Sequence, residues 1–198
     1  MLLLPVGVEF KKAWLNMPKL VLACQKFEPN ITIDTNTNPQ VEEVRVNMAE
    51  MKVERKQVEL VTSVGSCVAI CLYDSVHKCG GVAHIMLPYS SNSSQEPIPP
   101  KFADTAVPAL VKAIHQIVGK ESRLTAKISG GGNMFSSLGA NHLDIGAKNV
   151  NAVKATLDTC SIRLLGEDVG GTHGRRIMFN TASGTVKIRI FNGDVKTL

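Results

Sequence analysis

Two apolar, β-branched runs near the middle of the chain form its strongest hydrophobic pattern, at residues 60–74 and 80–88. The short segment between them, residues 75–78, consists mostly of turn formers. Two such runs joined this closely predict a β-hairpin. Further along, apolar residues at helical spacing predict one helix over residues 103–118 and a second helix within residues 141–157.

Other apolar runs predict further strands, at residues 43–53, 123–129, 162–166, 175–180 and 185–191. A polar loop at residues 167–176 leads into the fourth of these strands. Strands outnumber helices in this reading. We therefore expect an α/β fold, namely a single domain of mixed and antiparallel β-sheets, sandwich-like and flanked by helices.

The N-terminal part of the chain has a different composition from the rest. Residues 1–27 are apolar and basic with Pro18 interrupting any single helix, and residues 28–40 are a polar linker. We predict an N-terminal extension at residues 1–43 and one domain at residues 44–198. The extension is interpreted either as a poorly ordered segment or as a basic, Trp-bearing segment that docks on a partner or membrane surface.

The predicted hairpin brings a cysteine and a histidine together. A turn centred between Ser75 and Val76 places Cys67 directly opposite His84. Directly opposed residues share a face of the sheet, with Cβ atoms roughly 5 Å apart. A thiol beside an imidazole is the pairing that makes a thiolate nucleophile near neutral pH.

A non-catalytic interpretation of the same residues remains open. A free cysteine in an apolar strand is commonly a small buried hydrophobe, and one bulge at Gly80 and Gly81 would turn His84 to the other face. Gly65 and Ser66 precede the cysteine. Glycine tolerates the tight backbone of a nucleophile turn, and backbone N–H groups there can stabilise an oxyanion.

Metal and nucleotide sites are not expected. Cys67, Cys71, Cys79 and His84 nominally supply four zinc ligands, but Cys67 and Cys71 are ~13 Å apart on an extended strand, too far for one tetrahedral ion. The glycines at 130–132 lack the Lys-Ser/Thr of a P-loop. We predict tight packing near the active site for them, and no cofactor.

The composition indicates which kinds of binding partner and which cellular compartment to expect. The 198-residue chain carries a formal charge of +5, which favours acidic partners, and it has no nucleic-acid-binding motif. No apolar run approaches the ~20 residues that span a bilayer, and no secretory signal is recognised. Five cysteines without regular spacing favour a reducing cytoplasm. We expect a cytoplasmic protein without membrane insertion.

Several motifs occur in order along the chain. They are TSVGSCVAICLYD at 62–74, GGVAHIMLP at 80–88, KFADTAV at 101–107, AKISGGGNMF at 126–135, IGAKNV at 145–150 and LGEDVGG at 165–171. Together they resemble the signature of the CheD family, the chemoreceptor glutamine deamidases. The resemblance covers roughly residues 44–192.

The resemblance implies an enzyme, a protein-glutamine glutaminase that hydrolyses glutamine side-chain amides and releases ammonia. Cys67 is then the nucleophile and His84 the general base and acid. The family's third catalytic residue is a threonine shortly before the cysteine, which corresponds to Thr62, with Ser63 as the nearby substitute. Gly65 and Ser66 are expected to shape the oxyanion site.

The resemblance also implies partners. The substrate would be a methyl-accepting chemotaxis receptor, a long helical coiled coil rich in acidic and amide side chains, and a CheC-type phosphatase would bind the enzyme. One alternative is a non-catalytic regulatory module of chemotaxis that binds the receptor or CheC. Another is a different cysteine acyl-transfer enzyme, a protease or a transglutaminase.

Overall fold

The structure is a computed structural model that describes residues 41–92, 98–134, 145–191 and 193–198. The first described strand, β1, begins at Glu42. The predicted extension at residues 1–43 therefore lies almost wholly outside the described residues, and its boundary with the domain stays a prediction.

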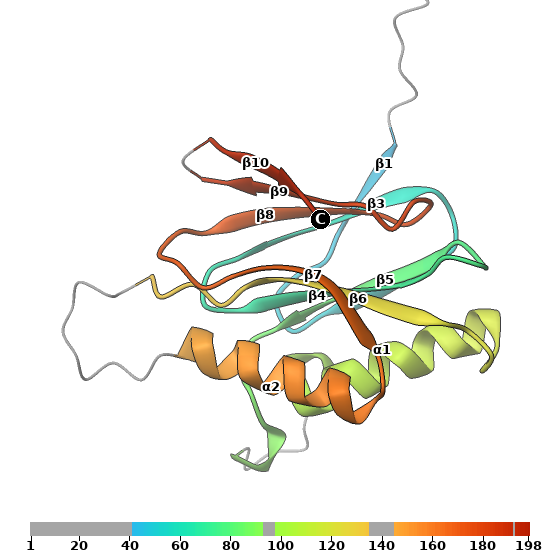
Figure 1. The fold of residues 1–198 in the computed structure, drawn as a ribbon, viewed down its shortest axis with the longest axis horizontal. Coiled ribbons are helices and arrows are strands. Elements are labelled where there is room, and N and C mark those ends of the chain that lie inside the picture. Colours follow the sequence, from blue (N-terminus) through green and yellow to red (C-terminus); the bar gives the residue numbers. More distant parts are fainter. Residues whose placement is uncertain (1–40, 93–97, 135–144, 192) are drawn as a thin grey trace, which may run out of the picture. The chain divides into compact units, whose positions relative to one another are not determined.

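Two five-stranded β-sheets form the frame of the described part (Figure 1). The first, called the open sheet, has the order β1 (Glu42–Arg45), β3 (Val58–Val64), β8 (Arg175–Asn180), β9 (Val186–Ile190) and β10 (Val195–Thr197). The second, called the covered sheet, has the order β2 (Met51–Glu54), β5 (Cys79–Ile85), β4 (Val68–Asp74), β6 (Leu124–Gly130) and β7 (Arg163–Val169).

Two helices, α1 (Ala103–Val118) and α2 (Ile145–Thr159), lie against the covered sheet on the side away from the open sheet (Figure 1). One apolar cluster fills the space between helices and sheet, and a second fills the space between the two sheets. Every residue of β4 and β5 is buried because both faces of these strands are packed. The predicted sandwich-like α/β class is confirmed.

The two predicted helices are present. The helix expected at 103–118 has those bounds, and the carboxylate of Asp104 in its first turn accepts hydrogen bonds from the backbone N–H and the hydroxyl of Ser90. The second helix begins at Ile145 and continues two residues beyond the predicted end at 157. Gly146, expected near the start of this helix, is its second residue, and residues 141–144 of the predicted segment lie outside the described residues.

The apolar run at residues 60–74 is not one strand, contrary to the prediction. It divides into β3 and β4, which belong to different sheets and meet at a corner, residues 65–67. The corner is held by residues from a distant part of the chain. Gly132 donates its backbone N–H to the carbonyl of Gly65 at 2.8 Å, and Gly131 donates to the carbonyl of Cys67 at 2.8 Å.

The strand predicted at residues 43–53 is also divided. Its two parts, β1 and β2, lie in different sheets, and residues 46–50 cross between them. Ala49 takes a left-handed conformation with φ 55° in this crossing. The carboxylate of Glu50 accepts a hydrogen bond from the backbone N–H of Asn47 at 2.7 Å, which closes the turn. The Glu50 side chain therefore helps to close a turn that the apolar pattern does not predict.

The hairpin of β4 and β5 is present, but its turn lies later than predicted. Asp74 pairs with Cys79, so residues 75–78 form a four-residue turn. The buried Asp74 carboxylate accepts hydrogen bonds from the backbone N–H groups of Val76 at 2.8 Å and His77 at 3.2 Å. Lys78 completes the turn with φ 51°.

The later turn changes the pairing of the histidine. Ala69, not Cys67, lies directly opposite His84. The shift is two residues, and side chains alternate between faces with a period of two. Cys67 therefore stays on the face of the sheet that carries His84, as its packing in the inter-sheet cluster also shows.

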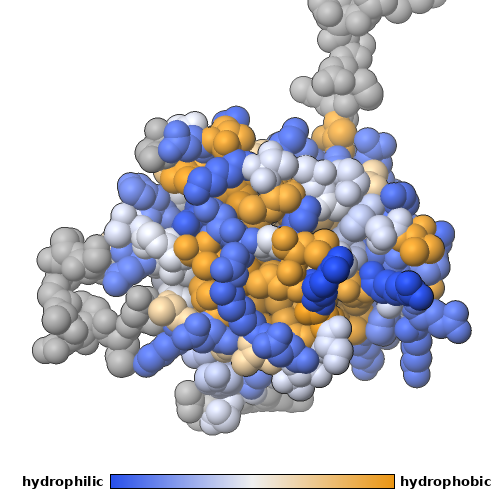
Figure 2. Space-filling view, viewed as in Figure 1, coloured by the Kyte–Doolittle hydropathy of each residue, from blue (hydrophilic) through white to orange (hydrophobic). Residues whose placement is uncertain are grey.

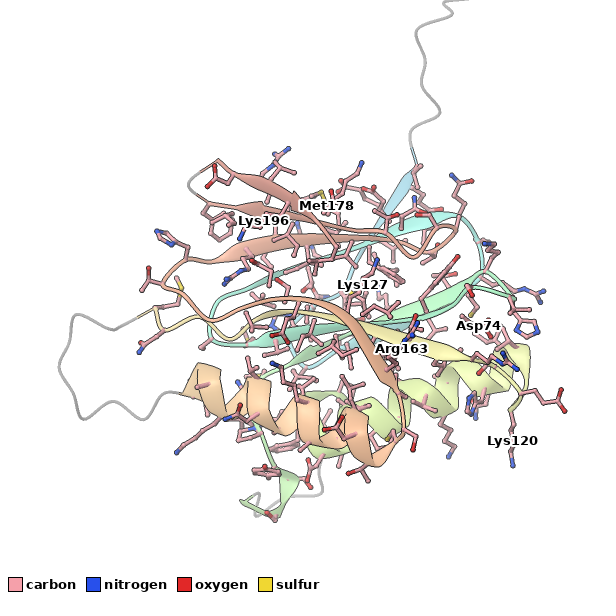
Figure 3. All side chains as sticks on the ribbon, viewed as in Figure 1. Asp74, Lys120, Lys127, Arg163, Met178 and Lys196 are labelled. Atoms are coloured by element: carbon pink, nitrogen blue, oxygen red, sulfur yellow. The ribbon has the colours of Figure 1, made fainter. Side chains whose placement is uncertain are left out.

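A half-buried cation links the layers of the sandwich. Lys127 of β6 extends between the two sheets (Figure 3), where its ammonium group donates to the carbonyls of Gly184 at 2.8 Å and Leu198 at 2.7 Å. Burial lowers the pKa of Lys127. These contacts join the covered sheet to the turn and the C-terminal residue beside the open sheet.

The edge of the covered sheet formed by β7 is partly apolar. Figure 2 shows hydrophobic surface gathered in the middle of the face on which β7 lies, with hydrophilic surface around it. Leu165 of β7 is 49% exposed. This edge differs in character from the cavity beside His84, described below.

Candidate active site

Cys67 lies at the corner between the two sheets, immediately before β4 begins. Its side chain is half-buried. The glycine loop at residues 130–132 packs directly against it, as predicted. Gly130 has φ +122°, and a Cβ atom there would lie 2.3 Å from the carbonyl oxygen of Cys67. Only glycine allows the two backbones to approach this closely.

Thr62 and His84 meet in the space between the sheets. Thr62 lies on β3 of the open sheet and His84 on β5 of the covered sheet, and each is 3% exposed. The Thr62 hydroxyl oxygen is 2.8 Å from Nδ1 of His84, a hydrogen bond. Nε2 of His84 is buried and has no hydrogen-bond partner within the described part of the chain.

The cysteine and the histidine occupy neighbouring positions on one face. Ala69 is opposite His84, and Cys67 comes two residues before Ala69 on the same face. Such diagonal neighbours are about 7–8 Å apart, within reach of long or aromatic side chains. The structure thus joins Thr62 to His84 by a hydrogen bond and places Cys67 at the diagonal position on the same face, instead of the predicted direct pairing.

Burial shifts the pKa values of both Cys67 and His84. It raises the pKa of the Cys67 thiol, and a hydrogen bond from the residue's own backbone N–H opposes this only in part. Burial lowers the pKa of His84. At neutral pH the resting pair is therefore a thiol and a neutral imidazole, the form that can accept a proton. Cys71 is more deeply buried than Cys67, and this burial raises its pKa to about 12.

A cavity of about 280 Å³ opens beside His84, at the edge where the chain crosses from β1 to β2. It is lined by Arg45, Val46, Asn47, Met48, Val61, Thr62, Ser63, His84 and Arg176. The crossing segment is fixed to the histidine, since His84 donates its backbone N–H to Glu50 and accepts from Ala49. These backbone hydrogen bonds tie the end of the crossing segment to β5 at His84.

Comparison with known proteins places the chain in a family. The family model described as CheD chemotactic sensory transduction matches residues 86–190. A protein of Desulforamulus reducens named "Probable chemoreceptor glutamine deamidase CheD" is 43% identical over 158 residues, which is 79% of this chain and 95% of the relative. One of Clostridium kluyveri with the same name is 43% identical over 161 residues, 80% of this chain and 99% of the relative.

The chain belongs to the CheD family. A relative in Clostridium botulinum, also named as a chemoreceptor glutamine deamidase, is 41% identical over 151 residues, 75% of this chain and 93% of the relative. The resemblance to the CheD family is therefore confirmed. The names of these relatives support an amidohydrolase activity on glutamine side chains.

Of the two hydroxyl groups considered for orienting the imidazole, only that of Thr62 contacts it in this CheD-family chain. Ser63 is exposed and lines the cavity instead. Ser66 and Gly65, expected at the oxyanion site, lie in the corner beside Cys67. Their carbonyls are engaged by the side chain of Asn149 at 3.0 Å and by the backbone of Gly132 at 2.8 Å.

Asn149 of α2 is a residue that sequence reasoning missed. Its side-chain amide also donates to the carbonyl of Met86 at 2.9 Å, so it joins the cysteine corner to the end of β5 beyond His84. Asn149 is fully buried on a helix face otherwise made of small and apolar residues. A polar side chain in a buried stripe was the available signal.

A second missed feature is the ion pair of Asp168 and Arg175. The sequence placed Asp168 in a polar loop, but it lies in β7 with its side chain 11% exposed, and that of Arg175 is 7% exposed. The Arg175 guanidinium also donates to the carbonyls of Gly170 and His173. It thereby fixes residues 170–174 beside the glycine loop that packs against Cys67.

We expect Asp168→Asn to destabilise the protein strongly. Removing one partner of a buried pair leaves the Arg175 charge uncompensated, which costs about 3 kcal/mol and lowers the melting temperature by about 6–12 °C. Lys196→Gln is the matched control. It removes the other cation on the same carboxylate, but its side chain is 51% exposed, so a change under about 1 kcal/mol is expected.

The difference between Asp168→Asn and the wild type depends on pH. Burial raises the pKa of Asp168, but hydrogen bonds from Lys196 and Arg175 and their charges outweigh it, so the pKa lies below its ordinary range. The carboxylate's stabilisation is complete above the ordinary pKa and is lost as pH falls through the lowered one. Melting curves of the two proteins should converge in acid; equal melting temperatures at neutral pH would contradict the prediction.

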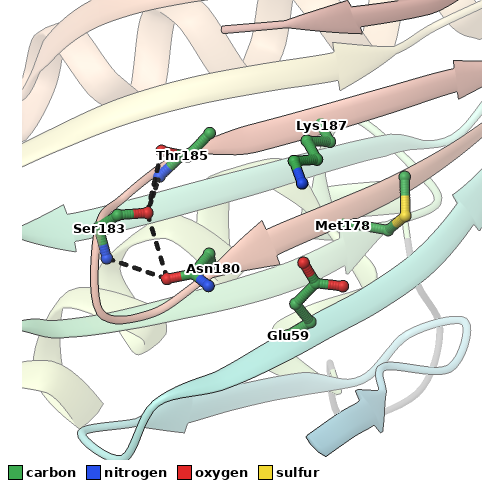
Figure 4. Close-up of a pocket in the computed structure, with 6 residues that line it drawn as sticks. All are labelled: Glu59, Met178, Asn180, Ser183, Thr185 and Lys187. Carbon is green, nitrogen blue, oxygen red and sulfur yellow. Dashed lines mark hydrogen bonds between the residues drawn. The ribbon is translucent and has the colours of Figure 1, made fainter. Parts of the chain in front are cut away.

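A further pocket lies away from this site. A cavity of about 250 Å³ on the open sheet is lined by Glu59, Met178, Asn180, Ser183, Thr185 and Lys187 (Figure 4). Three of the lining residues form one turn, where the Asn180 side-chain oxygen accepts hydrogen bonds from the backbone and hydroxyl of Ser183, and Ser183 also donates to the Thr185 hydroxyl. These hydrogen bonds stabilise the turn between β8 and β9.

The described residues contain neither a cluster of metal ligands nor a membrane-spanning helix. No group of three or more His, Cys, Asp or Glu side chains there is arranged to hold a metal ion. None of the helices described is both long enough and apolar enough to cross a membrane.

Proposed function

We propose that this protein hydrolyses the side-chain amides of selected glutamines in chemotaxis receptors, converting them to glutamates, with Cys67 as nucleophile, His84 as general base and acid, and Thr62 as the residue that orients His84. The observation that supports this assignment of roles is the Thr62–His84 hydrogen bond, which occupies Nδ1 and leaves the buried Nε2 without a hydrogen-bond partner among the described residues. Cys67 lies on the same face of the covered sheet as His84.

The first half of the reaction forms a thioester. Nε2 of His84 takes the thiol proton as the sulfur of Cys67 attacks the amide carbon of the glutamine. The carbon–nitrogen bond then breaks, and His84 returns the proton to the departing nitrogen, which leaves as ammonia. Backbone N–H groups of the corner at Gly65 and Ser66 hold the negative charge that develops on the oxygen.

The second half regenerates the thiol. His84, again neutral, takes a proton from a water molecule that attacks the thioester carbon. The carbon–sulfur bond breaks, the sulfur of Cys67 recovers its proton, and glutamate is released. In this tautomer Nδ1–H of His84 donates to the Thr62 hydroxyl oxygen, which prevents the ring from turning away from the sulfur.

Incubation of the protein with a receptor cytoplasmic fragment tests the proposed reaction. We expect ammonia release together with the small mass increase of NH₂ replaced by OH at specific glutamines in an intact chain, located by peptide mapping. Cleaved fragments would indicate a protease, and cross-linked glutamines a transglutaminase. Binding of the fragment without mass change or ammonia would indicate the non-catalytic module.

The proposed function also includes a binding partner and a cellular compartment. The resemblance to the CheD family supports a CheC-type phosphatase as the binding partner, and co-elution of the two purified proteins tests it. The free thiols of Cys67, Cys71, Cys79 and Cys160 support the cytoplasm as the compartment, since thiols persist in reducing conditions.

A further inference from the structure

The cavity beside His84 carries two guanidinium groups. Arg45 of β1 and Arg176 of β8 both line it, and these strands flank β3, the strand that carries Thr62. None of the lining residues is acidic. The lining of the cavity therefore combines two arginines with the histidine that we assign to catalysis.

The two arginines differ in how they are engaged. Arg45 is exposed, and within the described part of the chain no carboxylate pairs with it. Arg176 donates to the carboxylate of Glu43 at 2.8 Å, with side chains 35% and 55% exposed. Such a solvent-exposed pair is weak and exchangeable. A carboxylate brought by a substrate can therefore bind Arg45 directly and displace Glu43 from Arg176.

Guanidinium groups select the ligand's chemistry. Arginine presents a planar fork of N–H donors that matches the two oxygens of a carboxylate. Asn47 and Ser63 add neutral hydrogen-bonding groups to the cavity, and Met48, which is 60% exposed, adds an apolar edge. This mixture suits an acidic side chain on a peptide whose apolar part rests on Met48.

We propose that Arg45 and Arg176 form a carboxylate-binding subsite that selects glutamines with an acidic neighbour, a specificity that rests on the proposed deamidase function. His84, which lines the cavity, is the diagonal neighbour of Cys67, about 7–8 Å away. The near wall of the cavity is therefore within about 10 Å of the sulfur. On a helical substrate this corresponds to at most about seven residues.

The test compares two receptor fragments. One is unchanged, and in the other the acidic residues within about seven positions of each target glutamine are replaced by alanine. We expect the wild type to prefer the acidic fragment about tenfold in kcat/KM. The double variant Arg45→Gln/Arg176→Gln should remove the preference, and Lys187→Gln, which removes a cation exposed on the same sheet, should keep it.

A variant with the opposite expected effect excludes a general loss of folding. Glu43→Gln removes the anion that competes for Arg176, so the preference for the acidic fragment should increase. Added salt should reduce the preference because the pairs are exposed. An unchanged preference in the double variant, or an equal loss in Lys187→Gln, would overturn the subsite.

Binding to the Cys67→Ala variant separates this proposal from the catalytic one. Fluorescence titration of the two fragments against Cys67→Ala, with and without Arg45→Gln/Arg176→Gln, measures the carboxylate preference without chemistry. Absence of ammonia release from both fragments by the wild type would refute the proposed function, and the binding preference would then decide on the subsite alone.

Discussion

Ammonia release from a receptor fragment is expected to fall by about 10⁴-fold or more when Cys67 is replaced with alanine. Without the sulfur no thioester forms, and the remaining groups can only bind and polarise the amide. The measurement is a coupled ammonia assay, with peptide mapping of the same samples. Cys67 is half-buried at a corner and not part of the fully buried core, so the fold should be retained.

Cys160→Ala is the matched control for Cys67→Ala. Cys160 is also a partly buried free thiol, but it lies just beyond α2, on the helix side of the covered sheet. Full activity is expected from this control, and both variants should melt near the wild-type temperature. Ammonia release by a folded Cys67→Ala protein would show that another group is the nucleophile.

Replacement of His84 with glutamine should lower kcat/KM by about 10²–10⁴-fold, the usual contribution of a general acid–base group. Thr62→Val keeps the base but removes the bond to Nδ1, so its loss should be smaller. The wild-type pH profile supplies an independent readout. Because burial lowers the pKa of His84, the acid limb should lie below pH 6.5.

The sign of the pH effect follows from the base role. Neutral imidazole accepts the proton, and its fraction falls as pH drops through the lowered pKa, so kcat/KM should remain above half of its plateau at pH 6.5. In Thr62→Val the acid limb should persist with a lower plateau. An acid limb centred above pH 6.5, or full activity in a folded His84→Gln protein, would contradict the role of His84.

Local sequence patterns were sufficient to predict the two helices and the presence of the β-sheets. The helix at 103–118 was predicted to the residue because its apolar stripe and Asp104 are signals within a few turns. The register of the hairpin was wrong because its turn depends on the Asp74 carboxylate, which bonds to two backbone N–H groups. The prediction of a shared face survived only because the shift was even.

Contacts between distant segments could not be predicted from local patterns. The break in the run at 60–74 depends on Gly131 and Gly132, which hold the corner from more than sixty positions further along the chain. Asp168 was placed in a polar loop because its partner Arg175 is visible only in space. The pairing of Arg45 with Arg176 around one cavity has no sequence signal at all.

The hydrogen bond between Thr62 and His84 joins two β-sheets that are stacked without sharing strands. The length of this hydrogen bond therefore depends on how the two sheets pack against one another. Any loosening of the side chains between them, by heat or by a smaller residue far from the corner, would let the layers slide and misalign the imidazole. Catalysis in such a protein would fail while the fold still held.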